Sequence, residues 1–335
     1  MGLAGSTRAT DAGGPAIEVR GLRRTYRTSL GFVRRRTAEL EAVRGIDFEV
    51  ARGELFALLG PNGAGKTTTI KMLITLLLPT SGSARVLGYD VVADASAVRR
   101  RIGYVFGGDR GLYERLPAID NLRYFAELYG IDPARRRARI DELLDMVGLR
   151  GRERERVEGY SRGMRQRLHI ARGMLHDPPV LFLDEPTIGV DPVGARDLRD
   201  LIAGLTAAGK TVLLTTHYMF EADALCDRIA VIAQGRIVAE GTPQTLKRRV
   251  ADRAVVEIET FGVDGSTVAR IEDVATVSSV SVEERGQAQI VSVQASNGAE
   301  IAGEILALLG SVRVGRVTTR EPTLEDAYVA LVTES

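Results

Sequence analysis

The sequence predicts an α/β protein in which a mainly parallel sheet with helices on both faces is followed by a small α+β domain. Short apolar runs that are typical of buried strands alternate with segments that carry apolar residues at helical spacing. A glycine-rich segment stands between one of these runs and a helix. After residue 250 the order becomes strand, helix, strand, strand, helix, strand. This succession favours one large layered domain and a separate smaller one.

The elements expected in the first half are short strands and amphipathic helices. Pro133 suits the first turn of a helix, because the N–H that proline lacks is not needed there. The expected strands are Ile17–Arg20, Ile46–Val50, Leu55–Leu59 and Ile102–Val105. The expected helices are Thr67–Leu77, Asn121–Tyr129 and Arg135–Val147.

The second half opens with Val180–Asp184, a continuous apolar run that ends in an acid, as expected of a buried parallel strand. Helices and strands then alternate, and Gln234-Gly235 predicts a turn between the last two strands. The further elements are a helix at Pro192–Ala207, a strand at Thr211–Thr215, a helix at Met219–Leu225, and strands at Arg228–Ala233 and Arg236–Glu240.

The last part of the chain has a β-α-β-β-α-β order, which suggests a ferredoxin-like domain of regulatory or structural role. It holds no cluster of His, Cys or acidic residues at ligand spacing. The expected elements are strands at Val255–Thr260, Val277–Glu283, Gln289–Gln294 and Val312–Thr318, and helices at Ser266–Ile271, Ala299–Leu309 and Leu324–Val332. We therefore expect a disordered tail at 1–14, a main domain at 15–250 with a helical subdomain at about 107–178, and an accessory domain at 251–335.

Composition narrows the function classes. Of the 335 residues 44% are hydrophobic and 27% are charged, which is ordinary for a globular protein. The net charge of +1 gives no bias towards nucleic acid, and we expect no nucleic-acid partner. Cys226 is the single cysteine, which fits a reducing compartment. Because no apolar run approaches the roughly 20 residues of a membrane span and no signal peptide is recognisable, we expect a cytoplasmic chain.

The segment from Gly60 to Thr68 matches the phosphate-binding pattern G-x-x-x-x-G-K-[ST]. Its glycines let backbone N–H groups close around phosphate oxygens at a helix start, where the helix dipole favours anions. Lys66 is expected to reach the β- and γ-phosphates and the Thr67 hydroxyl to hold Mg²⁺. A coincidental glycine-rich turn is the alternative, although the strand before and the helix after supply the context that the motif requires. The expected phosphate-binding residues are Gly60, Pro61, Asn62, Gly63, Ala64, Gly65, Lys66, Thr67 and Thr68.

The acidic end of the strand Val180–Asp184 supplies a second feature. Carboxyl ends of parallel strands meet at one edge of a sheet, which places the Asp184 carboxylate beside the expected Mg²⁺. Glu185 follows directly, where it can polarise an attacking water. Alone, an acid after an apolar strand usually marks only the end of the strand. Together with the phosphate-binding segment, it predicts nucleotide hydrolysis.

Upstream of the acidic strand, Tyr160-Ser161-Arg162-Gly163-Met164-Arg165-Gln166-Arg167 resembles the signature motif of the ATP-binding-cassette (ABC) family, usually written L-S-G-G-Q. With the other motifs, the resemblance covers about residues 17–245. Ser161 is a good N-cap for a helix over Arg162–His176, so the motif offers a helix N-terminus to an anion. An ordinary capped helix is the alternative interpretation.

The signature departs from the family pattern in three places. Tyr160, Arg162 and Met164 stand where the family has Leu, Gly and Gln, and this variant resembles subunits of type-2 exporters, including the daunorubicin-resistance type. Ser161 and Gly163, the positions closest to phosphate in the family, are kept. The ending Pro322-Thr-Leu-Glu-Asp resembles the same subgroup.

The resemblance implies roles for residues elsewhere. The segment 186–191 resembles the D-loop, in which Asp191 helps to shape a dimer contact, and His217 resembles the switch histidine that contacts the γ-phosphate. Tyr26 is the candidate aromatic that stacks on adenine, with a buried tyrosine at a strand end as the alternative. The implied catalytic residues are Glu185, His217 and Lys66.

One residue of the family pattern is missing. After Ile102-Gly-Tyr-Val-Phe the family has a Gln that touches Mg²⁺ and the attacking water and senses the membrane partner, whereas this chain has Gly107-Gly108-Asp109. Either Asp109 or a water makes that contact, or the coupling runs differently. The segment 110–129 is expected to face the transmembrane partner. The basic cluster Arg34–Arg36 is expected either to touch lipid headgroups or the partner, or to form a solvated loop.

The resemblance implies a P-loop NTPase of the ABC type, with a mainly parallel core sheet, an antiparallel β subdomain and a helical subdomain, that uses ATP and Mg²⁺. Two copies are expected to form a head-to-tail dimer, in which Ser161 and Gly163 of one copy close over the ATP of the other. The family pattern implies export of a drug, lipid or polymer through a separate transmembrane permease, with the chain peripheral on the inner face of the membrane. The alternatives are a non-transport ABC ATPase of DNA repair or translation and a regulatory module that does not hydrolyse ATP.

Overall fold

The computed structural model describes residues 13–30, 36–107, 111–250, 253–296, 298–310 and 312–333. The chain divides into two compact units, Met1–Ile237 and Val238–Ser335. The expectations stated for residues 1–12, Arg34, Arg35, Gly108 and Asp109 fall outside the described residues.

A mainly parallel sheet forms the core of the first unit. Its strands are β3 (Leu55–Leu59), β6 (Ile102–Val105), β7 (Val180–Asp184), β8 (Thr211–Thr216), β9 (Arg228–Ala233) and β10 (Arg236–Gly241). Their order is β10-β9-β3-β8-β7-β6, and β3 runs parallel to both of its neighbours. Because every residue of β3 and β7 is buried, both sequences are continuous apolar runs. The predicted parallel core is confirmed.

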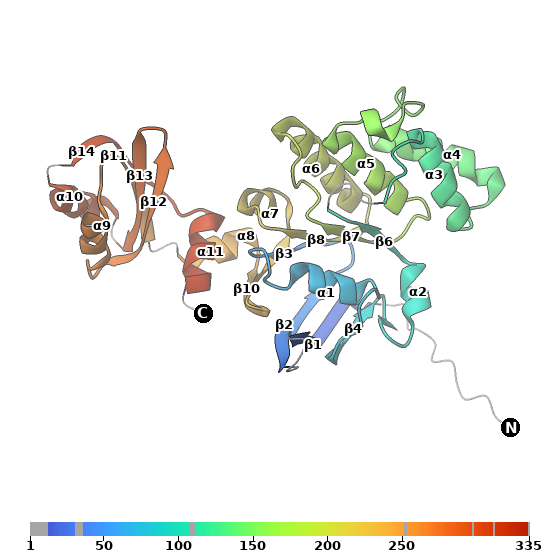
Figure 1. The fold of residues 1–335 in the computed structure, drawn as a ribbon, viewed down its shortest axis with the longest axis horizontal. Coiled ribbons are helices and arrows are strands. Elements are labelled where there is room, and N and C mark those ends of the chain that lie inside the picture. The colour runs from blue at the N-terminus through green and yellow to red at the C-terminus, as the bar shows by residue number, and fades with distance from the viewer. Residues whose placement is uncertain are drawn as a thin grey trace. The chain divides into compact units, whose positions relative to one another are not determined.

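Helices cover both faces of this sheet. They include α1 (Lys66–Leu73), α5 (Arg162–Gly173), α6 (Pro192–Ala207) and α7 (Met219–Leu225). Figure 1 shows α1 on one side of the sheet, with α5 and α6 on the other. α1 ends before the expected Leu77, since Thr75 adopts a left-handed φ of 67°, which a helix cannot contain. α5 likewise ends at Gly173 rather than at His176.

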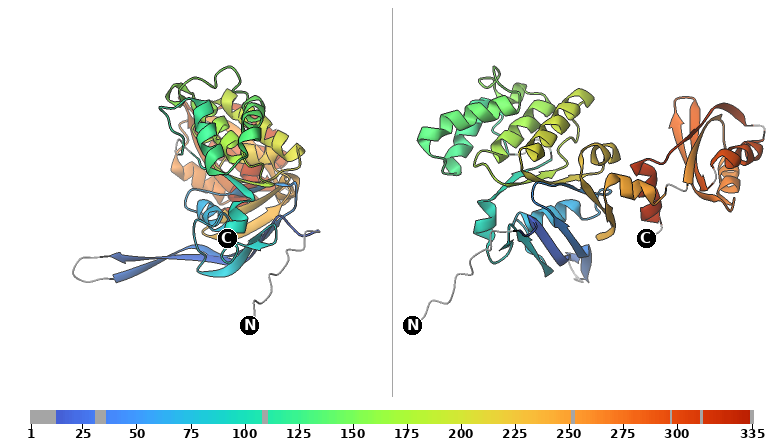
Figure 2. Two further views of the ribbon diagram at one scale, coloured as in Figure 1. Left: turned by 90° about the vertical axis from the view of Figure 1, so that its right-hand side faces the viewer. Right: turned by 180° about the vertical axis from the view of Figure 1, so that it is seen from behind.

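An antiparallel sheet in the order β2-β1-β4-β5 packs in the same unit. Its strands are β1 (Ile17–Leu30), β2 (Arg36–Val50), β4 (Ser81–Val86) and β5 (Tyr89–Asp90). β1 and β2 are much longer than the predicted Ile17–Arg20 and Ile46–Val50, and Figure 2 shows their far ends projecting as a two-stranded ribbon. β4 pairs with β1 only as far as Arg23, so the ribbon beyond has no buried face to impose an alternating apolar pattern. Cross-strand ion pairs join Arg23 to Glu41 and Arg27 to Glu39 instead.

A short helix precedes β6, and a helical region follows it. These elements are α2 (Ala95–Arg99), α3 (Ala118–Leu128), α4 (Pro133–Met146) and the 3₁₀ turn η1 (Val157–Gly159), after which α5 begins. α4 starts at Pro133, as the sequence indicates, and the Asp132 side chain accepts the Ala134 N–H at 3.0 Å as its cap. α3 begins earlier than predicted, because Asn121 lies inside its first turn, where its amide donates to the Pro117 carbonyl.

The second unit contains a four-stranded antiparallel sheet and helices of its own. Its strands are β11 (Arg253–Phe261), β12 (Val277–Arg285), β13 (Ala288–Ser296) and β14 (Arg313–Arg320), and its helices are α8 (Pro243–Arg248), α9 (Gly265–Glu272), α10 (Gly298–Leu309) and α11 (Leu324–Thr333). The sheet order is β12-β13-β11-β14. Apolar residues of β11 and β13 pack with those of α9 and α10 in one core. The predicted succession of strands and helices is confirmed.

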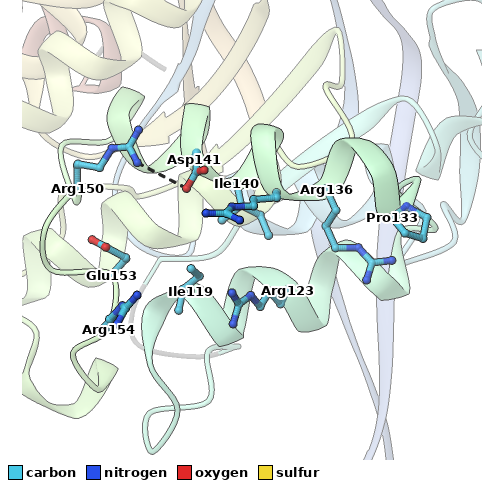
Figure 3. Close-up of a pocket in the computed structure, with 10 residues that line it drawn as sticks. Ile119, Arg123, Pro133, Arg136, Ile140, Asp141, Arg150, Glu153 and Arg154 are labelled. Carbon is cyan, nitrogen blue, oxygen red and sulfur yellow. Dashed lines mark ion pairs between the residues drawn. The ribbon is translucent and has the colours of Figure 1, made fainter.

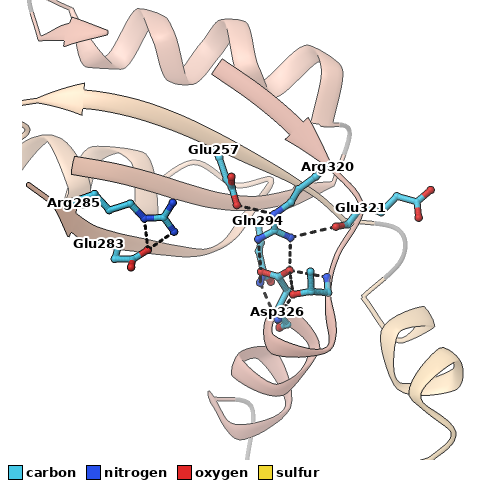
Figure 4. A network of polar contacts seen from close by, with 8 residues as sticks. Glu257, Glu283, Arg285, Gln294, Arg320, Glu321 and Asp326 are labelled. Carbon is cyan, nitrogen blue, oxygen red and sulfur yellow. Dashed lines mark hydrogen bonds and ion pairs between the residues drawn. The ribbon is translucent and has the colours of Figure 1, made fainter. Parts of the chain in front are cut away.

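A polar network ties α11 to the sheet of the second unit (Figure 4). Arg320 pairs with Glu257 at 2.6 Å and also with Asp326, whose carboxylate accepts the Thr323 N–H at 2.7 Å. The Gln294 amide donates to the same carboxylate at 3.2 Å. Burial alone would raise the pKa of Asp326, but the bonds from Arg320 and Thr323 outweigh it and hold that pKa below its usual value.

Candidate nucleotide-binding site

The loop between β3 and α1 is closely packed at Gly60 and Gly65, where there is room for backbone only. A Cβ at Gly60 would clash with the Ile232 carbonyl, and a Cβ at Gly65, whose φ is +108°, would lie 2.6 Å from the Ala42 carbonyl. The Gly235 N–H also donates to the Ala64 carbonyl at 3.0 Å. No side chain caps α1, so the N–H groups of its first turn remain available to an anion.

Lys66 begins α1 and its side chain is only 4% exposed. Its Nζ donates to the Gly60 carbonyl at 2.7 Å and the Pro61 carbonyl at 3.1 Å, and it lies 3.3 Å from Glu185 Oε1. These contacts fold the lysine back along the loop that the sequence predicts to hold phosphate. Its charge is therefore held where the backbone N–H groups converge, which makes the loop more attractive to an anion.

At the N-terminal end of α1, side-chain oxygen atoms from α1 and β8 lie within hydrogen-bond distance of a carboxylate oxygen from β7. The Thr67 hydroxyl at the start of α1 donates to Asp184 Oδ1 at the end of β7, at 3.1 Å. The Thr215 hydroxyl on β8 donates to the same oxygen at 2.6 Å. Asp184 is 8% exposed, and the parallel strands place its carboxylate at the edge of the sheet, as predicted.

Glu185 lies between the side chains of Lys66 and His217. Its Oε1 is 3.3 Å from Lys66 Nζ and its Oε2 is 3.3 Å from His217 Nδ1. Glu185 has a left-handed φ of 49°, and its N–H donates to the Thr215 hydroxyl at 3.0 Å. The turn out of β7 is thus held in an uncommon conformation that carries the carboxylate towards the lysine and the histidine.

The signature segment and the D-loop pack against each other. Ser161 caps α5 by accepting the Met164 N–H at 3.2 Å, and Asp191 caps α6 by accepting the Val193 and Gly194 N–H groups. A Cβ at Gly163 would lie 3.3 Å from Val190. Among the described residues, no hydrogen bond or ion pair joins Ser161 to the loop Gly60–Thr68. The structure therefore brings the expected site residues together in two groups, one around Lys66 and one around Ser161.

Comparisons with known proteins agree on one family. The ABC transporter family matches residues 43–188. The chain is 41% identical over 300 residues to the daunorubicin resistance ATP-binding protein DrrA3 of Streptomyces coeruleorubidus, which covers 89% of this chain and 93% of that protein. The chain belongs to the ABC transporter family.

Two further likenesses extend this assignment. The daunorubicin/doxorubicin resistance ATP-binding protein DrrA of Streptomyces peucetius is 47% identical over 233 residues, 69% of this chain and 67% of that protein. The solved dimeric structure of the ATP-binding cassette MJ0796 bound to ADP and Pi is 25% identical with a TM-score of 0.59, covering 68% of this chain and 98% of that one. The chain is an ABC ATPase that binds ATP, and it is the ATP-binding subunit of an exporter, with ATP hydrolysis coupled to transport.

Two positions need separate description: Tyr26, the candidate for the adenine contact, and Gly107, in the segment where the family has a Gln. Tyr26 is half-buried on β1, opposite Leu40, with the Arg24 guanidinium 4.8 Å from the centre of its ring. Gly107 follows β6 at the start of the segment that stands where the family has the Gln, and a Cβ there would lie 2.6 Å from the Asp184 carbonyl. A side chain at residue 107 is therefore excluded by the backbone of the acidic strand. Nearby, burial and the Asp184 charge raise the pKa of Tyr104.

Several contacts at the ABC site are not predictable from the sequence. The sequence puts Thr215 at the end of an apolar strand, but it does not specify that the Thr215 hydroxyl joins Asp184 to Glu185. The sequence also does not predict that Arg162 contacts Gly189, a glycine with positive φ that lies far along the chain. The three adjacent residues Thr215-Thr216-His217 at the end of an apolar strand were the signal that could have drawn attention to the hydroxyls.

A cavity of about 460 Å³ lies in the helical region, away from the nucleotide site (Figure 3). Arginines dominate its lining, and they include Arg123, Arg136, Arg150 and Arg154. Asp141 also lines it and lies 3.6 Å from Arg150. The lining shares no residue with the loop 60–68 or with the acidic strand, so this cavity is not part of the nucleotide site.

Proposed function

We propose that this chain is the motor subunit of a drug exporter, in which the Lys66 and Asp184 group forms the hydrolytic half of an ATP site. The observation that carries the proposal is the meeting of Thr67, Asp184 and Glu185 at the start of α1. The loop Gly60–Thr68 would hold the phosphates through backbone N–H groups and Lys66. Phosphoryl transfer of this kind depends mainly on positioning and charge stabilisation, which these groups provide.

Mg²⁺ fits the residues present. Thr67 Oγ1 and Asp184 Oδ1 are neighbouring oxygen ligands, and Mg²⁺ is commonly bound by one or two protein oxygens together with phosphates and water. No group of three or more His, Cys, Asp or Glu suited to a metal occurs in the described ranges, which is consistent with a site completed by nucleotide. When bound, the ion would neutralise charge on the β- and γ-phosphates.

Glu185 and His217 would act on the water and the γ-phosphate. Glu185 is the acidic side chain beyond Asp184 and is 17% exposed, so it can accept a hydrogen bond from a water that attacks phosphorus. His217 is 27% exposed and lies 3.3 Å from that carboxylate, where it can hold the carboxylate and contact phosphate. Tyr26 remains our candidate for the adenine contact.

We further propose that two copies pair head to tail and complete each other's sites. Ser161 and Asp191 are exposed, and they lie with Gly163 in a group apart from the phosphate loop of their own chain. The solved dimer of the relative MJ0796 supports pairing of such cassettes. In the pair, the N-terminus of α5 from one copy would offer its N–H groups to the γ-phosphate held by the other.

A mixing experiment tests the shared site. Lys66→Ala removes the lysine, and Ser161→Asp keeps an N-cap while adding a negative charge that repels phosphate. Each variant alone should release little phosphate from ATP. An equal mixture should recover about a quarter of the wild-type rate, because half the dimers are mixed and each of those has one intact site. No recovery would overturn the shared site, whereas an inactive wild-type chain would overturn the ATPase assignment to these residues.

The proposed function also requires a partner protein in the membrane. None of the helices in the described part of the chain is long and apolar enough to cross a bilayer. We propose that a separate permease carries the substrate, and that the chain lies on the inner face of the membrane through that permease. Several relatives are named for resistance to daunorubicin or doxorubicin, which favours a drug-like organic compound as the cargo. We expect a permease gene beside the gene for this chain; co-purification of the two proteins, and export of such compounds by the pair in vesicles, would test the proposal.

The second unit would serve as an accessory domain of this motor. We propose that it is ferredoxin-like, because its strands and helices follow in the order β-α-β-β-α-β and its antiparallel sheet has the order β12-β13-β11-β14. We propose main and accessory domains at 15–250 and 251–335, with the helical subdomain at about 107–178. Limited proteolysis that releases a fragment beginning near residue 251 would support these limits.

A further inference from the structure

An arginine stands at each end of α5, the helix that begins at the signature segment. Arg162 is its first residue and Arg172 lies in its last turn. Each donates to the backbone carbonyl of a glycine in a loop of the nucleotide-site region. Both glycines, Gly189 and Gly111, have positive φ angles, of 69° and 102°.

Arg162 contacts the D-loop, residues 186–191, through the backbone of Gly189. Its Nη1 donates to the Gly189 carbonyl at 3.3 Å, and a Cβ at Gly189 would clash with the same guanidinium nitrogen. Glycine is favoured at 189 by the left-handed backbone, and the Arg162 guanidinium occupies the space that a Cβ would take, so a side chain there would displace the arginine. Since the family has glycine where this chain has Arg162, relatives with the usual residue have no side chain for this contact.

Arg172 makes the corresponding contact at the other end of α5. It is 7% exposed, and among the described residues it has no carboxylate partner; it donates to the Gly111 carbonyl and lies 5.1 Å from the centre of the Phe125 ring. A Cβ at Gly111 would lie 2.5 Å from its Nη1. Burial disfavours the charged guanidinium, and in the described part of the chain the Gly111 carbonyl and the Phe125 ring are contacts that stabilise it.

The two loops follow the two strands that frame the site. Gly189 comes after Glu185 in the loop that leaves β7. Gly111 comes after β6, and so does Gly107, at which a Cβ would lie 2.6 Å from the Asp184 carbonyl at the end of β7. α5 therefore has a contact at each of its ends with a residue that follows one of these two strands.

We propose that Arg162 and Arg172 are positioning residues that fasten the signature helix to the loops after β7 and β6, so that the helix and both loops move together when a site closes over ATP. The proposal rests on the function proposed above. It also supplies a connection between the signature helix and the segment after β6 in a chain that lacks the Gln of the family pattern. Neither arginine needs to touch the nucleotide.

Double-mutant cycles on the full chain test the two contacts. Gly189→Ala should lower ATP turnover about tenfold in the wild-type chain but only about twofold when Arg162→Gly is present, since the clash then disappears. Gly111→Ala should behave in the same way towards Arg172→Met. The strain of alanine at positive φ is common to both backgrounds and cancels. If the glycine substitution lowers ATP turnover by the same factor with and without the arginine, the proposal for that arginine is overturned.

A second measurement separates positioning from general damage to the fold. Arg162→Gly and Arg172→Met should each lower turnover at least about fivefold while leaving the affinity for MgATP within about twofold, and Arg172→Lys should restore part of the rate. A loss of MgATP affinity equal to the loss of turnover would contradict a positioning role. Thermal melting confirms that each variant is folded at the assay temperature.

Arg139→Met is the matched control. Arg139 is also a largely buried arginine that donates to backbone carbonyls at the end of α5, those of Met174 and Leu175, but it comes from α4 and contacts neither loop. Its replacement should leave turnover within about twofold. An equal loss in this variant would show that the effect is on the helix in general. A wild-type chain without ATPase activity would instead overturn the proposed function, so the two failures are distinguishable.

Discussion

The Thr215 hydroxyl joins the two acidic residues of the site. Its Oγ1 donates to Asp184 Oδ1 at 2.6 Å and accepts the Glu185 N–H at 3.0 Å. One hydroxyl on β8 therefore orients the carboxylate at the end of β7 and also holds the backbone of the next residue, whose φ is left-handed. The geometry of the expected metal ligand and that of the expected base depend on the same oxygen.

We expect Thr215→Val to raise the Mg²⁺ concentration that the ATPase requires without unfolding the chain. Valine has the same shape but leaves Asp184 with one donor fewer, at a cost of about 1–2 kcal/mol. The Mg²⁺ concentration that gives half-maximal turnover should therefore rise about 5–30-fold. Thr215→Ser keeps the hydroxyl and serves as the control. An unchanged Mg²⁺ requirement in the valine variant would show that this hydroxyl does not orient the metal ligand.

Lys66→Ala should remove most of the affinity for ATP. The lysine is buried against the Gly60 and Pro61 carbonyls, so its ammonium group is already placed at the loop, and charge-assisted bonds to phosphate are the strong ones. We expect at least a tenfold weaker binding of a fluorescent ATP analogue, about 1.4 kcal/mol. Lys71→Ala, on the exposed side of the same helix, should bind like the wild type. Equal affinity of the Lys66 variant would remove the lysine from the phosphate site.

Glu185→Gln should bind MgATP but release no phosphate. The glutamine keeps the shape of the side chain and leaves Lys66 and the phosphate loop in place, so ATP binds as well as before, while the water loses its proton acceptor. Size-exclusion chromatography with MgATP should then show a stable dimer. Asp184→Asn, one residue earlier, should instead weaken Mg²⁺-dependent binding. Wild-type turnover by the glutamine variant would contradict the base assignment.

Elements with two buried faces or clear end signals were predictable from the sequence. β3, β7 and β9 have their expected bounds because each is a buried apolar run with polar ends, and α6 begins where Asp191-Pro192 predicts a capped start. The β1–β2 ribbon was not predictable at its full length, since an element without a buried face carries no apolar alternation. β4 was missed for the same reason, as four of its six residues are exposed.

The site residues were predictable one motif at a time, but their contacts were not. Gly60–Thr68 and Val180–Asp184 are local patterns, each with a backbone reason of its own. The contact between Thr215 and Asp184 depends on two strands that pair in parallel, and the contact between Arg162 and Gly189 on the packing of α5 against the D-loop. Such contacts join residues far apart in the chain, and neither partner alone has a residue pattern that specifies the other.

His169 predicts a pH dependence of the stability of α5. Burial, with the nearby Arg172 charge, lowers the pKa of His169 to about 3, whereas the unfolded chain should titrate near 6.5. Between these values the unfolded state binds more protons, so the unfolding free energy falls as pH drops below about 6.5, by about 2 kcal/mol at pH 5. Hydrogen exchange of the α5 amides should show this loss in the wild type and not in His169→Leu. Gln166→Leu, a buried residue that does not titrate, should keep the wild-type loss; an equal loss in all three chains would show that the loss does not come from His169.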